Sequence, residues 1–367
     1  MIAFSSVAFF LGPILVGLGL VMLAPCFLAW EMGSADLGAF LISDAATMAT
    51  AATLILATRH HKPVLRIREM FLLTNLAWFM VCLFGALPFV LSQTVGGLTD
   101  AVFESVSAVT TTGATVLSQL DQLPKDILLW RSTMQWIGGL GIIGLGAAIL
   151  PYLRIGGMRL FRTESSDLSE KALPKTRRVL SRLLLTYLIL TALCAGSYWV
   201  AGMDAFDAIN HAMTTVSTGG FSTHDKSFAF FESGRIEIVG VLFMLLGGVP
   251  FMLYLPILSG HPTPLLRDSQ VHTMLLIYFG AASLLAVWLV ATGQMESVSA
   301  FREAAFNVVS IATTTGFVSA DYMEWGALAV MLFFFLTFVG GCSGSTSGGI
   351  KIFRFKIAFV MFRETIL

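Results

Sequence analysis

The sequence contains few charged residues. Asp, Glu, Lys and Arg together make up 12% of its 367 residues, whereas hydrophobic residues make up 56% and the mean hydropathy is +0.83. A soluble domain usually carries about 25% charged residues, so the composition excludes a soluble globular protein. The 22 basic and 22 acidic residues balance, so the net charge says nothing about partners, and we expect no nucleic-acid partner. We expect an integral membrane protein that contacts lipid.

The sequence also lacks the spacings that mark metal sites and catalytic centres. Its four cysteines lie in apolar segments without paired spacing, and its six histidines form neither HExxH nor HxxxH patterns. No acid–base dyad or nucleophile triad is apparent. We therefore predict that the chain is not an enzyme, has no transition-metal site and binds no cofactor of its own.

Long apolar runs, in contrast, are abundant. A helix needs about 20 apolar residues to cross a membrane. On this basis we predict eight membrane helices, at about 3–30, 37–58, 70–92, 127–153, 183–201, 236–258, 271–292 and 325–339, the last continuing irregularly to 362.

Basic residues are distributed unevenly among the loops that these helices define. Of the 22 Lys and Arg residues, 17 fall on one side, in 59–68, 154–182, 259–270 and 351–363. Short loops rich in Lys and Arg stay in the cytoplasm. The asymmetry predicts a multi-pass protein with both termini of this chain in the cytoplasm.

Three segments of the chain align without gaps, each between two predicted membrane helices: ESVSAVTTTGATV (104–116), NHAMTTVSTGGFS (210–222) and NVVSIATTTGFVS (307–319). In each segment an acidic or polar residue is followed nine positions later by a glycine, which two Thr or Ser residues precede. The equivalent sets in this alignment are Gly113, Gly219 and Gly316; Thr112, Thr218 and Thr315; Thr111, Ser217 and Thr314; and Glu104, Asn210 and Asn307. The repeated unit is a membrane helix, a half-helix, a Thr-Gly loop and a second membrane helix.

The repeated Thr-Gly loops suit a monovalent cation. Irregular backbone is tolerated at membrane depth where it is buried in protein or lines an aqueous cavity, and rings of backbone carbonyls can replace the hydration shell of K⁺. Glycine reaches backbone angles that other residues avoid. A single copy would favour a small-residue packing patch between membrane helices, but three copies in register favour an ion filter. We expect Glu104, Asn210 and Asn307 to tie each loop to its half-helix.

Four segments of the chain resemble the Trk/Ktr/HKT superfamily of potassium transporters: FESVSAVTTTGATV, NHAMTTVSTGGFSTHD, FNVVSIATTTGF and FFFLTFVGGCSGSTSGGIKIFRFKI. The chain is similar to the TrkH-type membrane subunit over essentially its whole length. The resemblance implies a pseudo-four-fold pore of four helix–pore-helix–helix repeats, selective for potassium where the filter residue is glycine. It also implies a homodimer in the bacterial inner membrane, resting on cytoplasmic, nucleotide-binding TrkA-type regulatory subunits. The basic linker 154–182 is the candidate docking segment for these subunits.

The predicted organisation is an all-α polytopic membrane protein. It comprises a peripheral helix pair (1–68), a first pore repeat with the basic linker (69–182), a second pore repeat (183–270) and a third (271–367). Family members continue through a fourth repeat, so we expect a C-terminally truncated chain with three of the four repeats. Two other functions stay open: a non-conducting truncated or regulatory membrane subunit, and an alternating-access cation symporter, since broken helices and repeats fit that class too.

A glycine-rich segment, GGCSGSTSGGIK (340–351), follows the last apolar run. It is not a phosphate-binding loop, because Ile350 separates Gly349 from Lys351, and it lacks the G-x-S-x-G of a nucleophile elbow. Each glycine destabilises a helix by about 1 kcal/mol relative to alanine, so we predict a helix break near mid-membrane, with helix resuming at Ile350. The resemblance implies an intramembrane gate loop at 340–349. The candidate gate residues are Gly340, Gly341, Cys342, Ser343, Gly344, Ser345, Thr346, Ser347, Gly348, Gly349 and Lys351.

Overall fold

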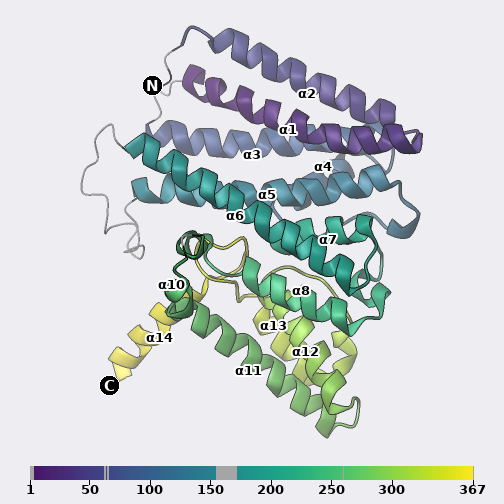
Figure 1. The fold of residues 1–367 in the computed structure, drawn as a ribbon, viewed down its shortest axis with the longest axis vertical. Helices are drawn as coiled ribbons and strands as arrows, with labels where there is room; N and C mark the ends of the chain where they lie inside the picture. Colours follow the sequence, from purple (N-terminus) through teal and green to yellow (C-terminus); the bar gives the residue numbers. More distant parts are fainter. Residues whose placement is uncertain (1–3, 62, 64–65, 154–171, 259, 367) are drawn as a thin grey trace.

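The computed structural model describes residues 4–61, 63, 66–153, 172–258 and 260–366 (Figure 1). In these residues helices dominate, and the only β-type pairing is an isolated bridge between Val339 and Ile350. The predicted all-α architecture is confirmed. Residues 154–171 of the predicted basic linker lie outside the described part of the chain.

The structure contains the following helices in the described residues. The α-helices are α1 (Phe4–Met32), α2 (Leu37–Thr58), α3 (Ile67–Leu91), α4 (Leu98–Val109), α5 (Lys125–Leu153), α6 (Ala172–Ala201), α7 (Ala205–Val216), α8 (Gly234–Gly247), α9 (Tyr254–Ile257), α10 (Thr263–Leu266), α11 (Ser269–Ala291), α12 (Ser297–Ala312), α13 (Ala327–Leu336) and α14 (Ile352–Ile366). Short 3-10 turns are η1 (Leu120–Gln122), η3 (Ser227–Phe231), η4 (Phe251–Leu253) and η5 (Tyr322–Trp325).

Helices α1 and α2 form a pair at one edge of the molecule, where α1 also packs against α3 and α5 (Figure 1). Glycine permits the close contact between them. A Cβ atom on Gly12 would lie 2.6 Å from Ile55 Cγ1, and one on Gly19 would lie 2.7 Å from Met48 Cε. Small residues commonly allow membrane helices to approach in this way.

Nine of the other helices repeat one pattern three times, as α3–α4–α5, α6–α7–α8 and α11–α12–α13. The middle helices α4, α7 and α12 contain 12, 12 and 16 residues. At about 1.5 Å per residue they measure about 18–24 Å, which is shorter than the hydrocarbon core of about 30 Å. Each middle helix is followed by a non-helical return, so the predicted half-helices are present in all three units.

The apolar run predicted at 236–258 is not one straight helix. Helix α8 ends at Gly247, and the helical segment Phe251–Ile257 is bent by 93° from it. Gly247 and Gly248 have low helix propensity, and Pro250 lacks the N–H that would continue the helix. Among the described residues, five helices are long and apolar enough to cross a membrane, and this bent pair would make a sixth.

The end of the third unit also differs from its predicted course. Helix α13 stops at Leu336, and α14 begins at Ile352 rather than at Ile350. The Ile350 N–H instead donates to Phe338 O over 2.9 Å, and Ile350 O accepts from Gly340 N over 3.0 Å. These bonds close the glycine-rich segment into a loop that is pinned at both ends.

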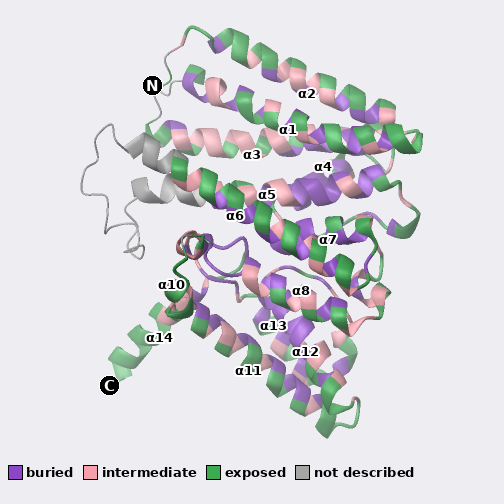
Figure 2. Ribbon diagram, viewed as in Figure 1, coloured by how far each residue is buried: buried purple, intermediate pink, exposed green. Residues whose placement is uncertain are grey.

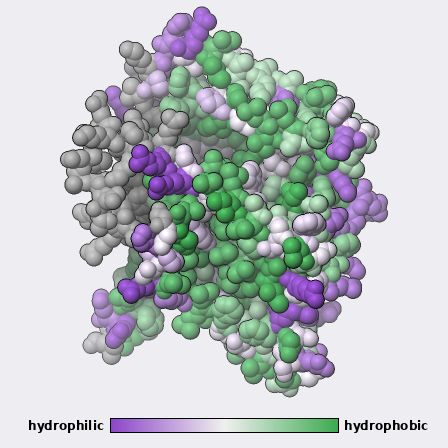
Figure 3. All heavy atoms as spheres, viewed as in Figure 1, coloured by the Kyte–Doolittle hydropathy of each residue, from purple (hydrophilic) through white to green (hydrophobic). Residues whose placement is uncertain are grey.

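Many of the buried polar side chains lie in the half-helices and in the part of α5 that packs against α4 and α7. Within residues 126–135 of α5, every residue except Leu129 is buried (Figure 2). Arg131 and Gln135 in this stretch are only 1% and 0% exposed. On the face shown in Figure 3, apolar side chains cover the middle, and hydrophilic ones gather mainly toward the helix ends. The surface therefore suits lipid, whereas the interior offers polar groups.

Candidate functional site

Each half-helix ends in a loop with the same backbone geometry. Two residues beyond α4, α7 and α12 lies a threonine with left-handed φ: Thr111 (55°), Thr218 (52°) and Thr314 (59°). Two residues further along lies a glycine with positive φ: Gly113 (80°), Gly220 (79°) and Gly316 (88°). We call residues 110–113, 217–220 and 313–316 the first, second and third Thr-Gly loops.

This geometry corrects the predicted alignment by one residue in the second repeat. Gly220, and not Gly219, corresponds to Gly113 and Gly316. The amides of Thr112, Gly219 and Thr315 donate to Ser107 O, Thr214 O and Ser310 O over 2.9, 2.8 and 2.9 Å. The equivalent sets are therefore Thr112, Gly219 and Thr315; Thr111, Thr218 and Thr314; and Thr110, Ser217 and Thr313. The sequence could not separate two adjacent glycines that differ only in their backbone angles.

The three loops lie directly against one another. A Cβ atom on Gly113 would lie 2.2 Å from Gly219 O, and one on Gly220 would lie 1.8 Å from Thr315 O. Glycine is needed at both positions for space as well as for φ. Carbonyl oxygens of the second and third loops thus lie beside the backbone of the preceding loop, an arrangement that can surround a dehydrated cation with carbonyl oxygens.

Side chains of the half-helices hold these loops by hydrogen bonds to the segment that follows each loop. Glu104 accepts hydrogen bonds from Thr115 Oγ1 at 2.9 Å and Val116 N at 3.1 Å. Asn307 Nδ2 donates to Ser319 Oγ over 3.0 Å. Both ties join a half-helix to the segment that follows its Thr-Gly loop.

In the second repeat His211 makes this tie, and not the predicted Asn210. Asn210 Nδ2 donates to Phe206 O within its own helix over 2.8 Å, whereas His211 Nε2 lies 3.0 Å from Ser222 Oγ. His211 Nδ1 donates to Asp207 O over 2.9 Å, which fixes the ring. The prediction missed His211 because of the one-residue shift, since His211 lies nine residues before Gly220.

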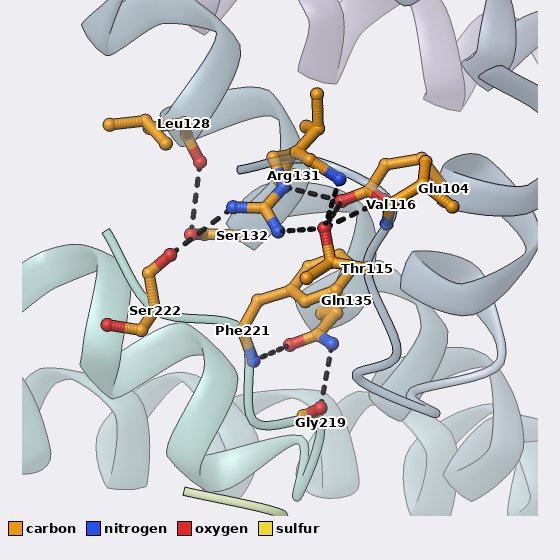
Figure 4. A network of polar contacts seen from close by, with 11 residues as sticks. Glu104, Thr115, Val116, Leu128, Arg131, Ser132, Gln135, Gly219, Phe221 and Ser222 are labelled. Carbon is orange, nitrogen blue, oxygen red and sulfur yellow. Dashed lines mark hydrogen bonds and ion pairs between the residues drawn. The ribbon is translucent and has the colours of Figure 1, made fainter. Parts of the chain in front are cut away.

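Arg131 on α5 joins the first repeat to the second (Figure 4). Its Nε donates to Glu104 Oε1 over 2.7 Å, its Nη2 to Thr115 Oγ1 over 3.1 Å and its Nη1 to Ser222 O over 3.2 Å. The guanidinium carbon also lies 4.2 Å from the centre of the Phe221 ring. The sequence offered one signal for this role, an ionisable residue at the start of an apolar run.

A charged cluster lies at the N-terminal end of α7, the end away from its Thr-Gly loop, and outside the predicted spans. His224 Nε2 is 3.0 Å from Asp207 Oδ2, and His224 Nδ1 contacts Asp121 Oδ1. Burial alone lowers the pKa of His224, but hydrogen bonds to the two carboxylates outweigh it and raise the pKa above its ordinary value. The hydrogen bond to His224 in turn lowers the pKa of Asp121. The cluster links the segment after the first Thr-Gly loop to the second repeat.

The glycine-rich loop docks onto the break in α8. Cys342 N donates to Gly248 O over 2.9 Å, and Phe251 N donates to Gly344 O over 2.9 Å. Thr346 Oγ1 donates to Gly247 O over 3.1 Å. The loop therefore satisfies Gly247 O, Gly248 O and Phe251 N, backbone groups that the break in α8 leaves free, and so stabilises the break.

The same loop touches the Thr-Gly loops from one side. Thr346 Oγ1 donates to Val216 O, the last residue of α7, over 3.1 Å. Gly348 N donates to Thr314 Oγ1 over 2.6 Å. Lys351 Nζ donates to Ser347 O, which keeps the ammonium group against the loop itself.

A cavity of about 350 Å³ separates the first Thr-Gly loop from the glycine-rich loop. Its lining combines the apolar side chains of Trp78 and Ile142 with polar groups of both loops, among them those of Thr110, Thr111, Ser347 and Lys351. Hydroxyl and carbonyl oxygens are the ligands that hard cations prefer. The described residues hold no group of three or more His, Cys, Asp or Glu side chains arranged for a metal ion.

Known proteins are similar to this chain in sequence and in fold. The family model of TrkH, described as cation transport protein, matches residues 37–366. The Trk system potassium uptake protein TrkI of Halomonas elongata is 45% identical over 348 residues, which cover 95% of this chain and 70% of that protein. The Trk system potassium uptake protein TrkH of Vibrio parahaemolyticus is 37% identical, covering 96% of this chain and 74% of that protein.

The fold is likewise similar to a solved structure. The crystal structure of the potassium transporter TrkH from Vibrio parahaemolyticus matches with a TM-score of 0.91 and 35% sequence identity, covering 100% of this chain and 76% of that chain. The matched residues include all three Thr-Gly loops and the glycine-rich loop. With its apolar helices, the chain is a multi-pass bacterial membrane protein and a transporter rather than an enzyme. It belongs to the TrkH family of cation transport proteins.

Proposed function

We propose that the chain carries out potassium uptake across the bacterial inner membrane as the membrane subunit of a Trk-type system. K⁺ would shed water on entering the Thr-Gly loops and be held there by backbone carbonyl oxygens. The observation that carries this proposal is the recurrence of a left-handed threonine and a positive-φ glycine in all three loops, with the glycines packed against carbonyl oxygens of the neighbouring loops.

The half-helices support the same function electrostatically. Each one ends at its Thr-Gly loop, and the C-terminal end of a helix carries a partial negative charge of about half an elementary charge. Three such ends, those of α4, α7 and α12, converge on one region. A cation in the cavity below the loops would be stabilised by these ends and by the threonine hydroxyls.

The glycine-rich loop would act as a gate for this pathway. It occupies the far side of the cavity from the first Thr-Gly loop and bonds to Val216 O and Thr314 Oγ1. We propose that ion flow requires the loop to leave this position. TrkA-type nucleotide-binding subunits, docked on the basic linker 154–182 of a homodimer with cytoplasmic termini, would control that movement.

A flux measurement tests the proposed function. The full gene product would be reconstituted in liposomes and assayed for uptake of K⁺ or Rb⁺ against Na⁺. We expect saturable uptake that favours K⁺. Gly220→Ala should strongly reduce this uptake, because the new Cβ would lie 1.8 Å from Thr315 O and φ is 79°.

A second glycine provides the matched control. Gly280 lies in α11, and an added Cβ would meet nothing within 4 Å. Gly280→Ala should therefore keep the uptake of the unmodified protein. Equal uptake of K⁺ and Na⁺ by the unmodified protein, or full uptake by Gly220→Ala, would contradict a Thr-Gly potassium filter.

A further inference from the structure

Gln135 reaches from the first repeat into the second Thr-Gly loop. Its Nε2 donates to Gly219 O over 2.8 Å, and its Oε1 accepts from Phe221 N over 3.1 Å (Figure 4). The residue is completely buried on α5. Both halves of one amide side chain therefore hold the backbone on the two sides of Gly220, the glycine with positive φ.

The other two loops are held in a different way. At the position of Gly219 they carry threonines, and these hydroxyls pair within the loop: Thr112 with Thr110 at 2.8 Å, and Thr315 with Thr313 at 2.7 Å. Gly219 has no side chain to form such a pair. Ser217, the counterpart of Thr110 and Thr313, donates instead to Thr214 O over 3.3 Å.

The space that a side chain on Gly219 would need is filled by Gln135. A Cβ atom on Gly219 would lie 2.4 Å from Gln135 Oε1, 2.5 Å from its Cδ and 2.9 Å from its Nε2. Gly219 does not have the positive φ that would require glycine. The glycine at 219 is thus explained by the Gln135 side chain and not by the backbone conformation.

We propose that Gln135 is a specificity-determining positioning residue. It fixes the backbone conformation of the second Thr-Gly loop, whereas a pair of threonine hydroxyls does so in the first loop and in the third. It acts on the ion through Gly219 O and through the peptide groups around Gly220. This inference rests on the proposed function of the Thr-Gly loops as a potassium filter. Loss of the Gln135 bonds leaves a buried carbonyl and a buried N–H without partners, and a loop in that state reorients to satisfy them.

The test compares K⁺ and Na⁺ flux through liposomes that contain equal amounts of monodisperse full gene product. Gln135→Leu keeps most of the side-chain volume but removes both bonds. Gln135→Glu keeps an acceptor for Phe221 N but removes the donor to Gly219 O. We expect the K⁺/Na⁺ flux ratio to fall about tenfold in both variants.

A compensating pair of substitutions makes the test specific. Gln135→Ala opens the space, and Gly219→Thr then supplies a hydroxyl that can pair with Ser217, as in the first and third loops. We expect the double variant to recover part of the K⁺/Na⁺ flux ratio that Gln135→Ala loses. Gly219→Thr alone should lower the ratio, because its side chain would clash with Gln135. Ser132→Ala is the matched control on the same buried face of α5, because Ser132 Oγ donates only to Leu128 O in its own helix.

The outcomes separate this inference from the proposed function. An unmodified protein without preference for K⁺ would overturn the filter itself. An unmodified protein that prefers K⁺, with the same ratio in Gln135→Leu or Gln135→Glu, would overturn the role of Gln135 alone. A double variant no better than Gln135→Ala would show that Gln135 does not replace the threonine pair.

Discussion

The backbone amide of Gly348 donates a hydrogen bond to the hydroxyl of Thr314 over 2.6 Å. Gly348 belongs to the glycine-rich loop and Thr314 to the third Thr-Gly loop. Thr346 adds a second link, through Val216 O, to the end of the second half-helix. Under the proposed function, the gate and the filter are therefore in direct contact, and the gate cannot move without releasing bonds to the filter region.

The first prediction concerns this contact. Thr346→Val keeps the shape of the side chain but removes its bonds to Val216 O and Gly247 O. Gly247 O keeps a hydrogen bond from the amide of residue 346 at 3.4 Å, but leaving the buried carbonyl Val216 O unsatisfied costs about 1–3 kcal/mol, and 1.4 kcal/mol corresponds to a factor of about ten. We expect basal Rb⁺ flux in liposomes without regulatory subunits to rise about tenfold. Thr292→Val is the control, because this exposed threonine bonds only within its own helical turn, and it should leave the flux unchanged. The same flux in both variants would show that the loop does not limit ion flow.

The second prediction concerns the buried ion pair. Arg131→Met leaves Glu104 without its cation, and breaking one side of a buried pair costs about 3–5 kcal/mol. We expect a large fall in the thermal midpoint of the purified protein. Combining it with Glu104→Gln should restore part of the loss, because neither group is then charged.

Arg302 offers the control for this ion pair. Its Nε lies 3.0 Å from Glu237 Oε2, and the two side chains are 38% and 9% exposed, whereas those of Arg131 and Glu104 are 1% and 0% exposed, so solvent screens the Arg302 pair more. Arg302→Gln should therefore lower the midpoint less than Arg131→Met does. Equal shifts of the midpoint for Arg131→Met and Arg302→Gln would argue against a special contribution of Arg131, which joins the first repeat to the second, to stability.

The third prediction tests the corrected register in the second repeat. His211→Ala removes the tie to Ser222, so we expect the K⁺/Na⁺ flux ratio to fall by several-fold. Asn210→Ala, one residue away, removes only a bond to its own helix and should keep the ratio. The opposite order of effects would support the original alignment with Asn210.

The fourth prediction concerns pH. The raised pKa of His224 means that its protonated form is favoured in the folded state. That stabilisation is complete below the ordinary His pKa of about 6.5 and is lost as the pH rises through the higher folded-state pKa. We expect the thermal midpoint to fall as the pH is raised above about 6.5.

A variant of the same residue checks this assignment. His224→Gln keeps hydrogen-bonding capacity but cannot gain a proton. The thermal midpoint of this variant should therefore not fall as the pH is raised above about 6.5. The lowered pKa of Asp121 acts in the other direction, since its contribution is lost only as the pH falls toward its folded-state pKa. A decline of the same size in His224→Gln would assign the pH dependence to another group.

Much of the architecture could be predicted from local patterns. The three half-helices follow from short amphipathic segments between apolar runs, and the loop after Leu336 follows from its dense glycines. These features depend on propensities that each segment carries within itself. The break in α8 was missed because its apolar run continues through Gly247 and Pro250, and the break is stabilised by a loop about 95 residues away in the chain.

The details of the candidate site depend on contacts between repeats. Gly219 and Gly220 are identical in sequence and differ only in φ and in what each one packs against. Arg131 and Gln135 lie in an apolar helix of the first repeat, yet both act on the second. No pattern along one segment reveals such contacts, because they form only when the three units assemble.

The central claim is that the Thr-Gly loops bind a dehydrated monovalent cation through backbone carbonyls. Crystals of the full gene product grown in Rb⁺ test it most directly, through the anomalous scattering of the ion. We predict a Rb⁺ peak surrounded by the three loops near Gly113, Gly220 and Gly316, and loss of this peak in Gly220→Ala. Ordered loops with no Rb⁺ between them, while Rb⁺ binds elsewhere in the protein, would contradict the account.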